Sequence, residues 1–184
     1  MKLTNRYRER FRKIVHRYQG SAVGFRCDEV KLPHGGTRTR QYLTHPGAVA
    51  VLALTPGRKI LLIKQFRYPV GEFTYEIPAG KLAPGEAPAA CVRRELEEEA
   101  GYQARRVVKI LSYWPTPAFS NEVLHIYIAD KLVPTHTNPD DDEFLEILEV
   151  SPATMEKMIR TGRIRDSKTL IAYLAWAHRT RAIR

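Results

Sequence analysis

The chain has 184 residues and a formal net charge of +10, with 43% hydrophobic and 27% charged residues. This length and composition predict one folded domain with its own core and exclude a disordered chain. The longest apolar runs, GAVAVLAL and ILLI, are too short to cross a bilayer, so no membrane span is expected. The two cysteines, Cys27 and Cys91, lack metal-site spacing and favour a reducing, cytoplasmic location.

The N-terminal segment 1–20 is strongly basic, with seven Lys or Arg residues and one Glu among its first 18 positions. Apolar residues recur there at helical spacing, which predicts a basic amphipathic helix docked on the protein surface. Contact with a nucleic acid or another anionic surface is the alternative. A transit peptide is disfavoured because the segment contains no Ser.

The rest of the chain reads as short strands followed by helices. Strands are predicted at apolar runs bounded by turn residues: 21–32, 37–44, 47–54, 59–66, 73–78, 107–114, 122–129 and 144–150. The turn TPGR predicts that 47–54 and 59–66 form a hairpin. Helices are predicted at 87–100, 151–162 and 166–179. Many strands around one acidic helix indicate a mixed α/β sandwich and not a doubly wound parallel sheet.

The helix over 87–100 holds four carboxylates in five residues, in a chain that is otherwise basic. Its ends are marked by Pro88 in the first turn and Gly101 just past the last. At about 100° per residue, Glu95, Glu98 and Glu99 share one arc, whereas Glu97 lies on the other side. The arc borders a predicted buried stripe of Ala89, Val92, Leu96 and Ala100.

This crowding of charge is unfavourable by itself, because like charges repel at i,i+4 and carboxylates at a helix C-terminus oppose the helix dipole. A hard divalent cation such as Mg²⁺ would make this crowding favourable, since it takes oxygen ligands. A solvated acidic helix face is the alternative. Cys91 lies on the carboxylate side, where we expect a small buried filler and not a nucleophile.

The residues flanking the cluster decide between these interpretations. From Gly80 to Tyr102 the spacing resembles the Nudix box, G-x5-E-x7-R-E-U-x-E-E-x-G-U, where U is bulky and apolar. The matching positions are Gly80, Glu86, Arg94, Glu95, Leu96, Glu98, Glu99 and Gly101. Tyr102 places an aromatic at the last U position, which is normally aliphatic. The chain thus resembles the Nudix hydrolase family.

The resemblance implies a Nudix α/β/α sandwich over 45–184, with a mixed sheet and a loop-helix-loop catalytic motif. The metal ligands that it implies are Glu95, Glu98, Glu99 and the backbone carbonyl of Ala79. The implied metal is Mg²⁺, with Mn²⁺ as a substitute. Glu98 is alternatively the catalytic group that orients the attacking water. Glu86 and Arg94 are expected to form an ion pair that holds the loop against the helix.

Outside the box, the chain is similar to the ADP-ribose pyrophosphatase branch of the family. The similar segments are HPGAVAVLAL, QFRYP before EIPAGK, and Pro117, 16 residues after Gly101. The implied reaction is Mg²⁺-dependent hydrolysis of ADP-ribose to AMP and ribose 5-phosphate. Thr116-Pro117-Ala118 stands where the branch commonly has Ser-Pro-Gly, so another nucleoside diphosphate sugar, such as GDP-mannose, is the alternative substrate. An RNA-binding or regulatory module is a further alternative, although the complete box does not favour nucleic acid as a partner.

Three side chains are candidates for binding the substrate. Arg67 can grip a diphosphate oxygen with two N–H groups. Phe119, or alternatively Tyr68, can stack on the base. Glu122 can meet a ribose hydroxyl or a water molecule.

A second acidic cluster, NPDDDEF, follows the predicted strands. In the branch, a carboxylate from this loop completes the metal site or acts as general base, and Glu143 is the candidate here. Asp141 is the alternative base, and a polar turn is the non-catalytic interpretation. The branch is commonly dimeric through exchanged N-terminal strands, so 21–44 is predicted to be the arm of a homodimer.

Overall fold

The computed structural model describes residues 5–138 and 144–181. The chain forms two compact units. Unit 1 comprises Met1–Pro46 and Trp114–Val123, and unit 2 comprises Gly47–Tyr113 and Leu124–Arg184.

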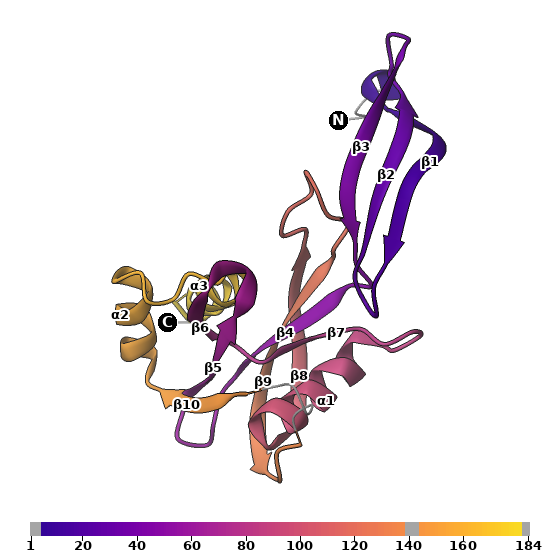
Figure 1. Ribbon diagram of the computed structural model, residues 1–184. Helices are drawn as coiled ribbons and strands as arrows, with labels where there is room; N and C mark the ends of the chain where they lie inside the picture. Colours follow the sequence, from indigo (N-terminus) through magenta and orange to yellow (C-terminus); the bar gives the residue numbers. More distant parts are fainter. Residues whose placement is uncertain (1–4, 139–143, 182–184) are drawn as a thin grey trace. The chain divides into compact units, whose positions relative to one another are not determined.

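Unit 1 is built on a three-stranded antiparallel sheet in the order β1-β2-β3 (Figure 1). Its strands are β1 (Arg10–Gln19), β2 (Gly24–Lys31) and β3 (Thr37–Thr44), preceded by a 3₁₀ turn η1 (Asn5–Tyr7). The two later strands confirm the sequence prediction. A loop from Trp114–Val123 joins the end of β3, where the Leu43 N–H donates to the Phe119 carbonyl at 2.8 Å.

The predicted N-terminal helix is wrong, because its residues form the exposed strand β1. The register shifts between Phe11 and Lys13 and again between Ile14 and His16. These bulges interrupt the two-residue alternation of a strand, so the apolar residues fall at a spacing that imitates a helix. Aromatic and β-branched side chains favour the strand, and pairing with β2 satisfies its backbone.

Unit 2 contains two sheets. The four-stranded sheet has the order β7-β4-β9-β8, and the three-stranded sheet has the order β10-β5-β6. Their strands are β4 (Ala48–Ala53), β5 (Ile60–Arg67), β6 (Glu72–Glu76), β7 (Ala79–Lys81), β8 (Tyr102–Tyr113), β9 (Leu124–Pro134) and β10 (Glu146–Val150). A 3₁₀ turn, η2 (Tyr68–Val70), joins β5 to β6. β4 runs parallel to β9 and all other pairs are antiparallel, so the larger sheet is mixed.

The predicted hairpin of β4 and β5 is wrong, although its turn exists. The Arg58 N–H donates to the Thr55 carbonyl at 2.8 Å, and a single bridge joins Leu54 to Ile60. Beyond this bridge the two strands enter different sheets. Strand β4 is wholly buried, as is the first half of β5, and each strand finds its partners elsewhere, so the local turn does not determine the pairing.

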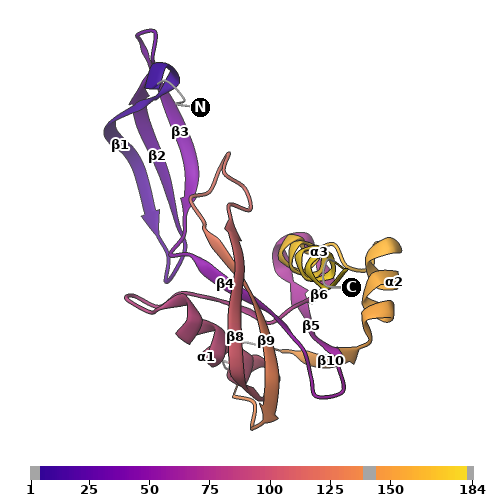
Figure 2. The same cartoon turned by 180° about the vertical axis from the view of Figure 1, so that it is seen from behind.

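Three helices complete unit 2: α1 (Pro88–Ala100), α2 (Pro152–Arg160) and α3 (Ser167–Arg181). Figures 1 and 2 show α1 and α3 on opposite sides of the four-stranded sheet. The buried residues of β4 alternate accordingly. Val49 and Val51 pack with Leu96 of α1, whereas Ala50 and Leu52 belong to the cluster that contains α2 and α3. This layering confirms the predicted α/β/α sandwich.

The helix boundaries follow the expected local chemistry. Pro88 begins α1, and Gly101 ends it in the left-handed conformation at φ 67°. Ser151 caps α2 by accepting from the Thr154 N–H at 3.0 Å. Ala89, which we expected to be buried, is exposed, because it precedes the part of α1 that packs on the core. No described helix is long and apolar enough to cross a membrane.

Candidate active site on the acidic helix

The last two turns of α1 bury two of the predicted carboxylates beside the core. Glu95 and Glu99 are only 8% and 5% exposed, and Glu98 is half-buried. Glu97 instead accepts from the Gln103 side chain at 2.8 Å. The structure therefore separates Glu97 from the other three carboxylates, as the helical arc predicted.

Strand β7 lies directly against this helix face. A Cβ added to Gly80 would come within 1.8 Å of a Glu95 carboxylate oxygen, so only glycine leaves room for that side chain. One residue earlier, the Ala79 N–H donates to Glu99 at 2.9 Å. Pairing of Gly80 with Val49 in β4 anchors the strand. The box glycine is thus the position where the backbone closely approaches the carboxylates.

Arg94 binds three carboxylates at once. Its guanidinium lies 3.0 Å from Glu86 and 2.8 Å from both Glu95 and Glu98. The hydrogen bond from Arg94 lowers the pKa of Glu86 to about 2. The predicted Glu86–Arg94 pair is confirmed, and it ties the loop before α1 to the helix.

Cys91 is fully buried within this cluster, as predicted. Its sulfur lies 3.9 Å from a Glu95 oxygen and 3.5 Å from the Lys81 carbonyl. Burial, and then the charge of Glu95, raises the pKa of the Cys91 thiol to about 12. A thiol that stays protonated is not a nucleophile at neutral pH.

The chain returns to the end of α1 after strand β9. The Thr135 N–H donates to the Gly101 carbonyl at 2.8 Å, and the Asn138 N–H donates to the Glu98 carbonyl at 3.0 Å. The predicted base candidates Asp141 and Glu143 lie outside the described residues.

The donors gathered here are carboxylate and carbonyl oxygens, the ligands that Mg²⁺ prefers in proteins. Glu95 fills the space left by Gly80, and Glu99 is fixed by the Ala79 backbone, so the chemical type of these oxygen donors suits a hard divalent cation. Over 5–138 and 144–181, no group of three or more His, Cys, Asp or Glu side chains has an arrangement that could hold a metal ion. Glu95 and Glu98 instead turn to the Arg94 guanidinium.

Arg67 is held by a partner that the sequence did not suggest. Its Nε and Nη2 donate to the two oxygens of Glu76 at 2.8 and 2.7 Å. The hydrogen bonds that Arg67 donates to Glu76 raise the pKa of Arg67, and the charges of Asp166 and Glu99 raise it further. Arg67 therefore lies within electrostatic reach of the acidic helix, at the end of β5.

The other candidates for binding the substrate are Phe119, Glu122 and Tyr68, and they differ in position and exposure. Phe119 and Glu122 belong to the loop of unit 1, where Phe119 is 54% exposed and the Glu122 N–H donates to Ser120. Tyr68 follows Arg67 in unit 2 and is 88% exposed. An exposed aromatic ring is free to stack on a flat ligand.

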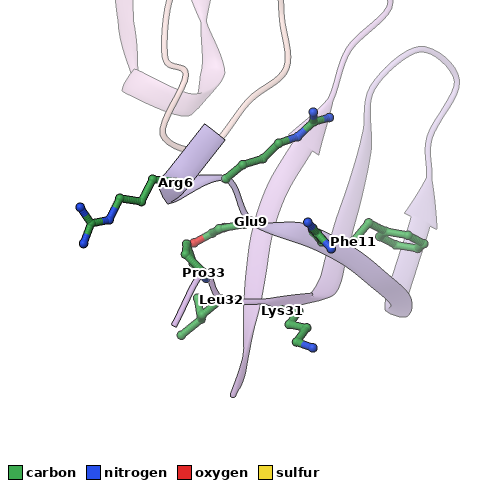
Figure 3. A pocket seen from close by; sticks show the side chains of 8 residues that line it. Arg6, Glu9, Phe11, Lys31, Leu32 and Pro33 are labelled. Carbon is green, nitrogen blue, oxygen red and sulfur yellow. The ribbon is translucent and has the colours of Figure 1, made fainter. Parts of the chain in front are cut away.

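A separate hollow of about 690 Å³ lies in unit 1 among basic residues. Its lining residues are Arg6, Arg8, Glu9, Arg10, Phe11, Lys31, Leu32 and Pro33. Figure 3 shows Arg6, Phe11 and Lys31 spreading in different directions instead of converging on one point. The hollow contains no residue of the box.

The sequence predictions missed the buried ionic residues around Arg67. Glu76 is 2% exposed, and it binds Lys168 as well as Arg67. A glutamate within the short apolar stretch FTYEIP was the available signal, because a buried carboxylate requires a partner. Its lysine partner lies 92 positions further along the chain, and no local pattern connects the two.

The sequence matches the NUDIX domain over residues 44–172. The chain belongs to the Nudix family. It is a Nudix hydrolase, and hydrolases of this family generally need a divalent metal ion. The match includes the whole box, helices α1 and α2, and the beginning of α3.

Individual relatives agree with this assignment. The chain is 40% identical over 157 residues to the ADP-ribose pyrophosphatase of Bacillus subtilis, covering 84% of this chain and 85% of that protein. It is 39% identical over 168 residues to the methanol dehydrogenase activator of Bacillus methanolicus, covering 90% and 91%. It is 33% identical over 134 residues to the GDP-mannose pyrophosphatase of Yersinia enterocolitica, covering 68% and 70%.

A solved structure described as an ADP compounds hydrolase superposes with a TM-score of 0.79. The superposition covers 94% of this chain and 95% of that chain, at 16% identity. At that identity the likeness shows the fold, which is that of a Nudix hydrolase.

Proposed function

We propose that this protein hydrolyses the diphosphate bond of ADP-ribose to AMP and ribose 5-phosphate, with Mg²⁺ as the metal and Mn²⁺ as a substitute. The observation that carries the proposal is the face of α1, where Glu95 packs into the space of Gly80 and Glu99 binds the Ala79 backbone. A relative that is 40% identical over 157 residues bears the name ADP-ribose pyrophosphatase.

In this proposal Glu95, Glu98, Glu99 and the Ala79 carbonyl hold the metal. When bound, the ion neutralises diphosphate charge and lowers the pKa of a bound water. Glu98 also orients the attacking water, and it is half-buried at the rim of the cluster.

The general base is assigned to Glu143, with Asp141 as the alternative, from the acidic loop. The support is the hydrogen bond of Asn138 to the Glu98 carbonyl, which brings the chain to the C-terminus of α1 five residues before Glu143. The base must lie within hydrogen-bonding reach of the water that it activates.

The substrate contacts in this proposal are assigned to three side chains. Arg67 binds the diphosphate, since it is fixed near the carboxylates and 43% of its side chain is exposed. Phe119 stacks on the base and Glu122 meets a ribose hydroxyl or water. Another nucleoside diphosphate sugar is the second candidate substrate, favoured by the GDP-mannose pyrophosphatase relative and by Ala118 in the place of a branch glycine.

A substrate panel tests the proposal. ADP-ribose, GDP-mannose, ADP-glucose, NADH and diadenosine polyphosphates are each incubated with the protein and Mg²⁺, and phosphate is measured after phosphatase treatment. We expect ADP-ribose to have the highest kcat/KM, with AMP and ribose 5-phosphate identified by chromatography. Equal or faster turnover of GDP-mannose would assign the second substrate instead.

We further propose that the protein is a homodimer joined through the strand arm over 21–44. The support is the exposed apolar surface of unit 1, which marks interaction sites. Its members are Phe11, Ile14, Val15, Tyr18, Phe25 and Leu43. Sedimentation analysis should give a dimer, and a monomer at all concentrations would refute it. A cytoplasmic location stays a prediction from the two free cysteines.

A further inference from the structure

The carboxylate of Glu76 is the centre of a second ion cluster in unit 2. Only 3% of its side chain is exposed, and it accepts two hydrogen bonds from Arg67. Lys168 at the start of α3 approaches the same carboxylate from the interior and also binds Asp166 at 2.9 Å. Two cations and two carboxylates therefore balance one another in a largely buried place.

Asp166 joins this cluster to the beginning of α3. Its second oxygen accepts from the Thr169 N–H at 2.9 Å, which caps the helix. The Thr169 hydroxyl in turn accepts from the Ile77 N–H at 2.9 Å, in a wholly buried contact. The helix end is thereby fastened to the residue that follows Glu76, in the segment that leads to Ala79.

The geometry at Arg67 leaves one edge of its guanidinium for a ligand. Nε and Nη2 are engaged with Glu76, and no described contact uses Nη1. A guanidinium bonded along one edge keeps a fixed plane, so its remaining N–H groups have a defined direction. Burial opposes the charge of Lys168, but Asp166 and Glu76 outweigh it and raise the pKa of Lys168, so the lysine stays charged.

We propose that Lys168, fixed by Asp166, is a positioning residue that holds Glu76 so that Arg67 presents its remaining N–H groups to the diphosphate. This inference rests on the proposed role of Arg67. Lys168 neutralises part of the negative charge of Glu76. The positive charge of Arg67 is therefore not fully cancelled by Glu76 and can attract the diphosphate. Without Lys168, Glu76 has Arg67 as its one cation, and the guanidinium is drawn to it.

The test compares Lys168→Met with wild type in two measurements: KM and kcat for the substrate with Mg²⁺, and the Kd for ADP in EDTA. We expect KM and Kd to rise about 10- to 100-fold, the range for a lost charge-assisted hydrogen bond. We expect kcat to change less than about threefold, because the metal ligands are untouched. Lys168→Arg should restore binding, since it keeps the charge.

Lys64→Met is the matched control, because Lys64 of β5 also pairs with a glutamate, Glu146 of β10, but at the surface. Its KM and Kd should equal those of wild type. Asp166→Asn keeps the helix cap and removes one charge, so it should weaken binding in the same direction with little effect on folding.

A folded Lys168→Met protein with wild-type KM and Kd would overturn the inference, and so would a fall in kcat at constant KM. If Lys168→Met does not fold, wild-type binding by Asp166→Asn overturns it. The role of Lys168 and the proposed hydrolysis of ADP-ribose can be refuted independently. A wild-type protein that binds ADP through Lys168 but does not turn over the panel would refute the proposed function alone.

Discussion

Unit 2 contains two ion clusters of opposite design. Around Arg94, one guanidinium binds the three carboxylates of Glu86, Glu95 and Glu98, with Glu99 on the same helix face. Around Glu76, the carboxylate is matched by Arg67 and Lys168, and the charges balance with Asp166. The first cluster keeps an excess of negative charge, and the second is neutral.

The difference shows how to distinguish a cluster that binds a metal ion from a cluster that holds a neighbouring side chain in place. An uncompensated set of carboxylates is unfavourable until a cation arrives, so it indicates a place for a metal ion. A compensated buried set is stable without a ligand, because each charge already has its partner. It can hold a neighbouring side chain in place but has no charge left to attract a metal.

The largest expected effect is at the uncompensated cluster. Glu99→Gln should lower kcat on the order of 10³-fold, because a metal ion stabilises several kcal/mol of transition-state charge and each 1.4 kcal/mol is tenfold. Glu97→Gln is the matched control on the same helix, since Glu97 binds Gln103 instead. A mild effect of Glu99→Gln in steady-state assays would remove Glu99 from the metal site.

The neutral cluster should respond through stability. Arg67 and Lys168 oppose the burial of Glu76 and lower its pKa to about 2, so the ion pair stabilises the fold above pH 4.5, and this stability is lost as the pH falls towards 2. Glu76→Gln should lose about 3 kcal/mol at pH 7, because it removes the buried carboxylate that pairs with Arg67 and Lys168.

Urea unfolding at pH 7, 4 and 2.5 measures this difference. The gap between wild type and Glu76→Gln should narrow as the pH falls, whereas the exposed Glu156→Gln variant should follow wild type throughout. A gap that is constant with pH would show that the charge of Glu76 does not contribute to stability.

A smaller effect is expected at Gly80, where the backbone of β7 closely approaches Glu95 of the first cluster. Gly80→Ala places a methyl group 1.8 Å from a Glu95 oxygen, so the carboxylate must move. Metal affinity measured by calorimetry should fall about 10- to 100-fold, as when a group that orients a ligand is changed. Gly57→Ala meets only a distant contact at 3.9 Å and serves as control. Unchanged affinity in Gly80→Ala would contradict the close fit of Glu95.

The smallest effect should come from a lysine–glutamate ion pair that is exposed at the surface. Lys64 and Glu146 lie 2.6 Å apart, with side chains 30% and 57% exposed. Lys64→Met should leave the urea midpoint within experimental error, because solvent screens surface pairs. If Lys64→Met lost as much stability as Glu76→Gln, the burial of an ion pair would not determine its contribution to stability.

Much of the acidic helix could be predicted because its signals are local. Pro88, Gly101 and the spacing of Glu95, Glu98 and Glu99 all lie within one short stretch, and the structure places them as the pattern required. The strand β1 was missed because bulges at Phe11 and Ile14 alter its alternation, a feature that appears only once β2 pairs with it.

The second cluster was missed for a related reason. Glu76 and Lys168 lie 92 positions apart in the sequence, and the contact exists only after α3 packs on the sheet. Arg67 was found as a charged residue in a strand, but its partner could not be named from sequence alone. Pairing of strands in separate sheets, as with β4 and β5, is decided by burial and not by the turn between them.

Metal dependence tests the central claim most directly. ADP-ribose hydrolysis is followed by AMP formation after EDTA treatment and dialysis, and then during a titration with Mg²⁺. The account predicts no turnover in EDTA and recovery to the original rate as Mg²⁺ is added, with Glu99→Gln showing little recovery. Turnover that persists in EDTA, or that Mg²⁺ does not restore in a folded protein, would contradict it.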